Sequence, residues 1–173
     1  IVNGRIPVVI ELSSLKINKE DFTMTKGTSE TLTVTGTPAD ALEGQTITWK
    51  SSNKDVVTVD SKGKVEAVGV GNATITATAA GKSDSVKITV NNPLKKITVD
   101  PATLTLKKGT SKTLSVKYDP ADTTDNKAVT WESSDKSVAT VDANGKVTAL
   151  KDGSATITAK VGKLTATCAL TVQ

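Results

Sequence analysis

The stretch that decides the fold of this chain is ITWKSSNKDVVTVD, at residues 47–60. A second version, VTWESSDKSVATVD, occupies residues 129–142. Each version carries one of the two tryptophans of the chain, Trp49 and Trp131. A large apolar side chain among few other aromatics is typical of a buried anchor. We therefore expect both tryptophans to be structural core residues, each on the central strand of its own domain, with the two serines that follow in a polar turn.

The similarity extends well beyond the tryptophan stretch. Residues 15–90 align with residues 97–172 without a gap, so that KGTS at 26–29 falls on KGTS at 108–111. ATITA occurs at both 73–77 and 155–159. A period this long exceeds that of solenoid repeats and equals a small domain. The sequence predicts a first domain at 13–91 and a second at 92–173, with residues 1–12 forming a linker or the end of a preceding domain.

Within each repeat the pattern favours strands. Hydrophobic residues make up 36% and aromatic residues only 2% of the 173 residues, and polar and apolar residues alternate in TLTVT at 31–35 and VKITV at 86–90. Such alternation is typical of strands with one buried face. Turn-forming residues separate them, as in DANG at 142–145. We predict an all-β protein built of β-sandwiches. The strands expected in the first repeat are 14–18, 22–25, 30–36, 45–50, 56–59, 64–68, 73–79 and 84–90.

The residue inventory argues against catalysis. Histidine is absent, which removes the commonest general base, and the Ser-Ser pairs after the tryptophans have no other candidate base in register. The single cysteine, Cys168, aligns with Val86 and is expected to be a buried apolar residue. We expect no catalytic residues and no cofactor.

Metal and nucleic-acid sites were weighed on the same basis. Calcium needs six or more oxygen ligands, and the acidic side chains show no EF-hand-like spacing, so no metal site is predicted. The aspartates considered were Asp55, Asp60, Asp135, Asp142 and Asp152. The net charge of +4 is spread over scattered lysines with few aromatics, so no nucleic-acid partner is predicted.

The two other aromatic residues, Phe22 and Tyr118, are expected to lie in different environments. Phe22 aligns with Leu104, which indicates a core position, whereas Tyr118 aligns with Gly36. Tyr118 is therefore the candidate exposed contact residue.

The hydropathy of the chain and its first ten residues bear on where the protein is located. No apolar run is long enough to span a membrane, so membrane insertion is not expected. Residues 6–10 have a strand-like pattern, and a chain that begins with Ile1 is expected to be a piece of a longer protein.

The order of these motifs resembles a known family. Thr48-Trp49 with Ser51-Ser52, the later Thr-Val-Asp, then GKV at 63–65 and ATITA at 73–77 are similar to bacterial immunoglobulin-like domains of group 2, and the second repeat follows the same order. The resemblance covers 13–173 and implies two tandem immunoglobulin-like sandwiches.

The resemblance also implies where such domains work. It implies a non-catalytic structural or adhesive spacer outside a bacterial cell, with host or cell-surface polymers or proteins as partners. Two alternatives stay open: exposed decoration of a phage tail or capsid protein on the virion surface, and an accessory, carbohydrate-binding module of a secreted polysaccharide-active enzyme. Fold kinship does not decide among them.

Overall fold

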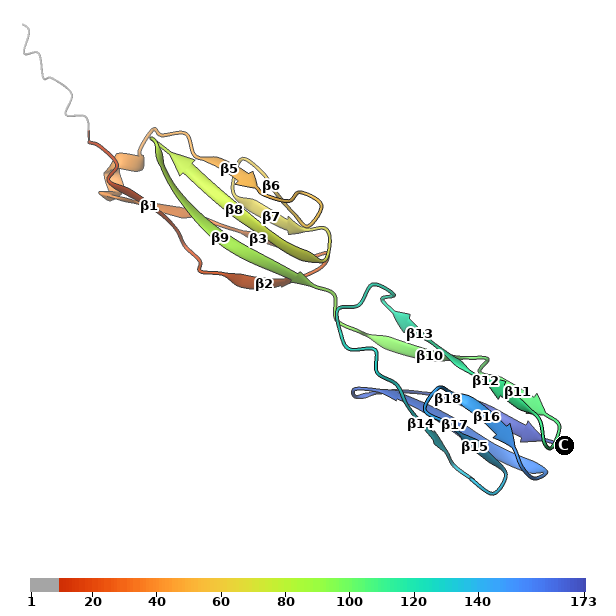
Figure 1. Ribbon diagram of the computed structural model, residues 1–173. Coiled ribbons are helices and arrows are strands. Elements are labelled where there is room, and N and C mark those ends of the chain that lie inside the picture. Colours follow the sequence, from red (N-terminus) through yellow and green to blue (C-terminus); the bar gives the residue numbers. More distant parts are fainter. Residues whose placement is uncertain (1–9) are drawn as a thin grey trace, which may run out of the picture. The chain divides into compact units, whose positions relative to one another are not determined.

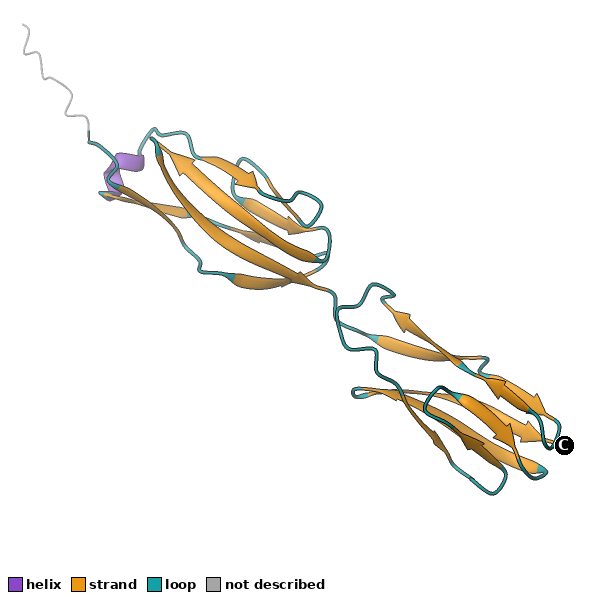
Figure 2. Ribbon diagram, in the orientation of Figure 1, coloured by secondary structure: helices purple, strands orange, loops and turns teal. Residues whose placement is uncertain are grey.

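The computed structural model describes residues 10–173, as two compact units that divide between Asn91 and Asn92 (Figure 1). Apart from one short 3-10 turn in the first unit, both units consist of strands joined by loops, so the all-β prediction is confirmed (Figure 2). Most of the segment expected to be strand-like at 6–10 lies outside the described residues.

The first unit has two sides, one formed by a four-stranded sheet and the other by two smaller sheets. One has the strand order β2-β9-β8-β5; the other side is formed by the pair β1-β4 and the three strands β3-β7-β6. The elements are β1 (Ser14–Ile17), β2 (Phe22–Thr25), β3 (Ser29–Thr31), β4 (Val34–Thr37), the 3-10 turn η1 (Ala39–Leu42), β5 (Thr48–Ser51), β6 (Val57–Val59), β7 (Lys64–Ala67), β8 (Gly71–Ala79) and β9 (Lys82–Asn91).

The second unit repeats this topology. Its four-stranded sheet has the order β11-β18-β17-β14, and its other side is formed by β10-β13 and β12-β16-β15. The elements are β10 (Lys96–Asp100), β11 (Thr103–Leu106), β12 (Ser111–Thr113), β13 (Ser115–Asp119), β14 (Thr130–Ser133), β15 (Ala139–Val141), β16 (Lys146–Ala149), β17 (Gly153–Val161) and β18 (Leu164–Val172).

In each unit the amino-terminal segment contributes one strand to each side of the sandwich. β1 pairs with β4 in one sheet, and the chain then crosses to form β2, which runs parallel to the last strand, β9. Phe22 lies opposite Ile88 and Thr25 opposite Asn91. The second unit has the same parallel pair, β11 with β18. Because the second and last strands of each unit run in the same direction, the chain comes in at one end of each unit and leaves at the other (Figure 1).

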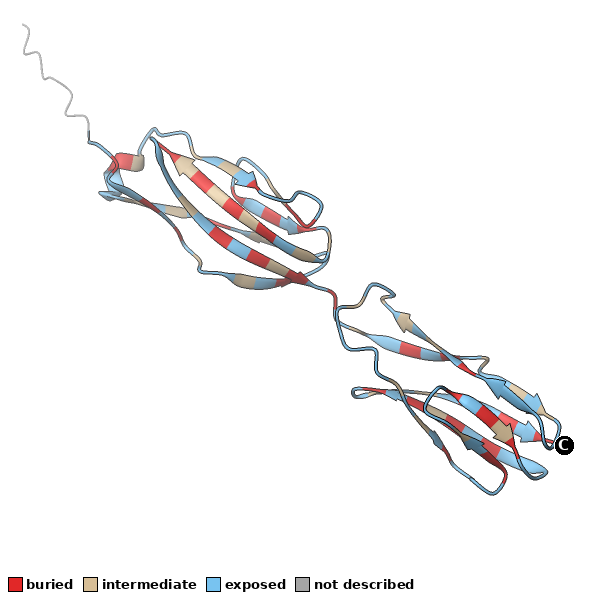
Figure 3. Ribbon diagram, viewed as in Figure 1, coloured by how far each residue is buried: buried red, intermediate tan, exposed pale blue. Residues whose placement is uncertain are grey.

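The core follows directly from the alternation read in the sequence. Every second residue is buried from Ala73 to the end of β8 and from Val86 to Val90 on β9, and Figure 3 shows the resulting bands. The largest fully buried side chains are aliphatic, among them Ile75, Ile88 and Ile157, all at 0% exposure. These long central strands therefore supply a large share of the buried apolar surface that stabilises each unit.

Two expectations about strands were wrong. The single strand expected at 30–36 is two strands, since β3 pairs with β7 and β4 pairs with β1. The break falls at Leu32, whose side chain is buried and whose N–H donates to Gly63 O. The tryptophan strand is also not central: β5 and β14 each pair with one strand only and lie at the edge of their four-stranded sheets.

Candidate functional site

Both tryptophans pack against their core clusters, but each ring is only half-buried. Each lies against the glycine of a turn in the opposite sheet. A Cβ on Gly63 would lie 2.9 Å from Trp49 Cζ2, and a Cβ on Gly145 would lie 2.8 Å from Trp131 Cζ2. Both glycines also have positive φ, +81° and +79°. The rings therefore close the margin of each core and do not form its centre.

The serines after the tryptophans are parts of the strand ends, and not of a simple polar turn. In the first unit, buried Ser51 Oγ donates to Val57 O at 2.6 Å, and Ser52 Oγ accepts from Thr74 N–H at 2.8 Å. In the second unit, Ser134 Oγ accepts from Thr156 N–H at 2.8 Å. These hydroxyls join the edge strand to its neighbours, which is a structural role.

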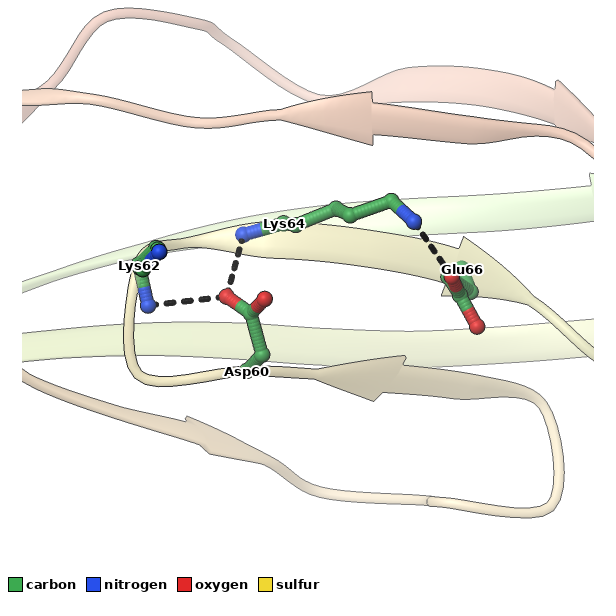
Figure 4. Close-up of polar contacts among 4 residues, drawn as sticks. All are labelled: Asp60, Lys62, Lys64 and Glu66. Atoms are coloured by element: carbon green, nitrogen blue, oxygen red, sulfur yellow. Dashed lines mark hydrogen bonds and ion pairs between the residues drawn. The ribbon is translucent and has the colours of Figure 1, made fainter.

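The aspartate that ends the tryptophan stretch organises a turn. Asp60 Oδ1 accepts from the N–H groups of Lys62 and Lys64, at 2.8 and 2.9 Å, and Lys64 Nζ pairs with Glu66 at 2.7 Å (Figure 4). The hydrogen bonds from the N–H groups of Lys64 and then Lys62 lower the pKa of the Asp60 carboxyl. Asp142 makes the same pair of bonds, at 2.8 and 2.9 Å, to the N–H groups of Asn144 and Lys146.

Of the remaining calcium candidates, Asp152 is exposed, and Asp55 and Asp135 make hydrogen bonds within their own loops. Asp135 Oδ1 accepts from Ser137 Oγ at 2.6 Å and from Ser137 N–H at 2.9 Å, and these bonds, the hydroxyl first, lower the pKa of the Asp135 carboxyl. Asp55 takes part through its N–H, which donates to Asn53 Oδ1. Across residues 10–173, no three His, Cys, Asp or Glu side chains are grouped so as to hold a metal ion.

Tyr118 is half-buried, and not the exposed residue that the alignment with Gly36 suggested. Its hydroxyl donates to Lys127 O at 3.1 Å, and Lys127 Nζ lies 5.1 Å from the ring centroid. The ring is thereby held against the 120–128 loop. In the first unit a Cβ at Gly36 would lie 2.6 Å from Leu12, which explains why no side chain is accommodated there.

Cys168 is fully buried on β18, and burial raises the pKa of its thiol. A raised pKa keeps the thiol protonated and unreactive near neutral pH. Phe22, expected in the core, is half-buried and packs against it, with Lys19 Nζ 4.7 Å from the ring centroid.

The surface feature that the motifs did not reveal is a pair of adjoining clefts beside Trp131. One, of about 260 Å³, includes Ser133 and Thr140; the other, of about 410 Å³, includes Thr158 and Lys160. Both clefts are lined by Trp131, Glu132 and Lys136. The only sequence signal was the change from Lys50 to Glu132 between the repeats, which by itself is typical of an exposed position.

With this geometry described, the comparisons with known proteins identify the class. The model of the bacterial Ig-like domain, group 2, matches residues 12–90 and again 93–172. The chain therefore belongs to this family, as two tandem domains, and the resemblance noted from the motifs is confirmed.

Three curated relatives show the range of proteins that contain such domains. Lacto-N-biosidase of Bifidobacterium bifidum is 51% identical over 70 residues, 40% of this chain and 6% of that protein. Ice-binding protein 1 of Shewanella frigidimarina is 32% identical over 127 residues, 69% of this chain and 14% of that protein. The minor capsid protein of Enterobacteria phage T3 is 38% identical over 87 residues, 50% of this chain and 19% of that protein. The chain thus spans less than a fifth of each relative.

Solved structures support the fold. The four amino-terminal Ig domains of Dscam1 isoform 4.44 match with a TM-score of 0.57 at 14% identity, over 93% of this chain and 47% of that one. At this identity the match shows the immunoglobulin-like fold alone. Within residues 10–173, no helix has the length and apolarity needed to cross a membrane.

Proposed function

We propose that the chain is a non-catalytic structural and adhesive spacer module of a bacterial cell-surface or secreted protein. The observation that carries the proposal is the parallel pairing of the second and last strands in each unit, β2 with β9 and β11 with β18. Lys26 N–H donates to Asn91 O at 2.8 Å in the first unit, and Lys108 N–H to Gln173 O at 3.1 Å in the second. The chain therefore leaves each domain at the end opposite to the one where it arrived.

With this arrangement each domain adds a fixed length between the segments that it connects. β9 has 10 residues, which corresponds to about 33 Å at the rise of a parallel strand. A tension applied to the two ends of a domain loads the β2–β9 hydrogen bonds in parallel, so that they have to break together. A module that separates other parts of a protein under load needs these two properties.

The motif residues that could have formed a site have structural roles instead. The tryptophans pack against their core clusters, and the two turn aspartates and three of the four serines make backbone hydrogen bonds within their domain. The chain has no histidine to serve as a base. The partners we propose are cell-surface or host polymers or proteins.

Two other settings remain candidates because the named relatives include them. The relative that is a minor capsid protein supports a place on a phage virion, and the relative that is a lacto-N-biosidase supports an accessory role in a secreted carbohydrate-active enzyme. An antibody raised against residues 10–173 separates the three. Labelling of intact bacterial cells supports the cell-surface spacer, labelling of purified virions the second setting, and co-purification with a secreted glycosidase the third.

The spacer role itself is tested by pulling single molecules from both ends. We expect two unfolding steps of roughly 25 nm each, the extended length of about 80 residues less the folded span. Gradual extension without discrete steps would contradict the proposal.

A further inference from the structure

The second domain carries a surface constellation that the first domain lacks. Glu132 on β14 and Lys136 in the following loop line both clefts beside Trp131. At the aligned positions the first domain has Lys50 and Lys54, so an acid–base pair is replaced there by two bases. Both positions are exposed, one on the edge strand β14 and one in the loop after it, where folding does not require either residue.

The clefts offer hydrogen-bonding groups of every kind around one apolar surface. Glu132 is an acceptor, Lys136 and Lys160 are donors, and Thr140 and Thr158 are both. The half-buried indole of Trp131 supplies the apolar face. The larger cleft, about 410 Å³, lies within the ~300–1,000 Å³ typical of small-ligand sites.

A buried serine hydroxyl, that of Ser133, lies at the smaller cleft. Ser133 is 6% exposed, lines the smaller cleft, and its Oγ has no hydrogen-bond partner within residues 10–173. Its counterpart Ser51 donates to Val57 O at 2.6 Å and accepts from Asn53 N–H at 3.2 Å. A buried polar group without a partner costs free energy, so it calls for an explanation such as a strained site, a functional role or a bound water or ion.

We propose that the second domain binds a short saccharide in these clefts, with pyranose hydroxyls hydrogen-bonded to Glu132 and Lys136 and a sugar C–H face against Trp131. A saccharide fits because it presents many hydroxyls and one apolar ring face, which match the lining. The proposal goes beyond the spacer role, which holds whether or not a sugar binds.

The test is a titration of the ¹⁵N-labelled full chain with chitotetraose, a neutral probe, and with tetragalacturonic acid, an acidic one. We expect chemical-shift changes at the Trp131 indole N–H and at Glu132 and Lys136, but not at Trp49, with at least the neutral probe. Glu132→Lys, which installs the residue of the first domain, should weaken binding about tenfold or more, the effect of losing a charged hydrogen bond. Lys50→Glu in the first domain is the matched charge change outside the site and should leave binding unchanged.

Other outcomes overturn the proposal. These are no shift with either probe, equal shifts around both tryptophans, unchanged affinity in Glu132→Lys, or binding of the acidic probe alone that disappears with added salt. The last result would mean attraction of an anion to lysines and no recognition of sugar hydroxyls. None of them affects the force measurement that tests the spacer role.

Discussion

The substitution Gly145→Ala tests whether Trp131 packs against a position that only glycine can occupy. The added Cβ would lie 2.8 Å from Trp131 Cζ2 and 2.9 Å from Leu114 O, closer than real Cβ contacts allow. The backbone there also has φ of +79°. A non-glycine residue in this region costs about 1–2 kcal/mol, and forcing extra volume against a packed group costs about 1–3 kcal/mol more. We expect a total of roughly 2–5 kcal/mol.

A matched control separates the two contributions. Gly109 in the same domain has φ of +83°, but a Cβ there would meet nothing within 4 Å. Gly109→Ala should therefore show only the backbone cost, about 1–2 kcal/mol. In a Trp131→Ala background, Gly145→Ala should lose the part of its cost that the ring causes, which makes a double-mutant cycle.

The assay has to report on one domain at a time, because both domains unfold in the same tube. Hydrogen exchange followed by mass spectrometry in increasing urea gives a midpoint for peptides from 92–173 separately from those of 10–91. The reasoning is refuted if Gly145→Ala and Gly109→Ala cost the same, or if the cycle shows no coupling between Gly145 and Trp131.

Three further outcomes are expected. Ser51→Ala should destabilise the first domain by about 1–3 kcal/mol because Val57 O loses its buried donor, whereas Ser133→Ala should be neutral or stabilising; equal losses in urea melts would contradict this contrast. The pKa of Asp60 is lower folded than unfolded, so its contribution to stability is complete above about pH 4 and is lost as pH falls through the folded pKa; Asp60→Ala should remove that pH dependence at the turn in an NMR-monitored acid titration. Trp131→Ala should cost about 3 kcal/mol, near the lower end for core aromatics because the ring is half-buried, and a loss near zero would remove its structural role.

Much of the fold could be read from local pattern. The alternation in residues 73–79 and 84–90 predicts β8 and β9 almost to their ends, because a strand with one buried face imposes a period of two wherever it occurs. The position of Cys168 could be inferred from its aligned valine for the same reason. The duplication doubled this information, since each expectation could be checked in the second repeat.

The wrong predictions share one cause: the local sequence does not show which distant segment a strand or side chain will contact. Residues 30–36 alternate as one strand, yet Leu32 marks a change from one sheet to the other. The tryptophan strand has the most recognisable sequence but lies at a sheet edge. Tyr118 was placed by its alignment with a glycine, and the alignment could not show that the 120–128 loop holds its ring.

By itself, then, the sequence determined that the protein is two all-β domains with aliphatic cores, because composition and period act locally along the chain. Only the tertiary structure decided that the second and last strands of each domain run in parallel, that Trp131 rests on Gly145, and that Thr158 lines the same cleft as Glu132 and Lys136. Those relations depend on contacts between segments far apart in the chain, and the free energy of such contacts is set by packing in three dimensions. The proposed roles in reach and in saccharide binding rest on this second kind of information.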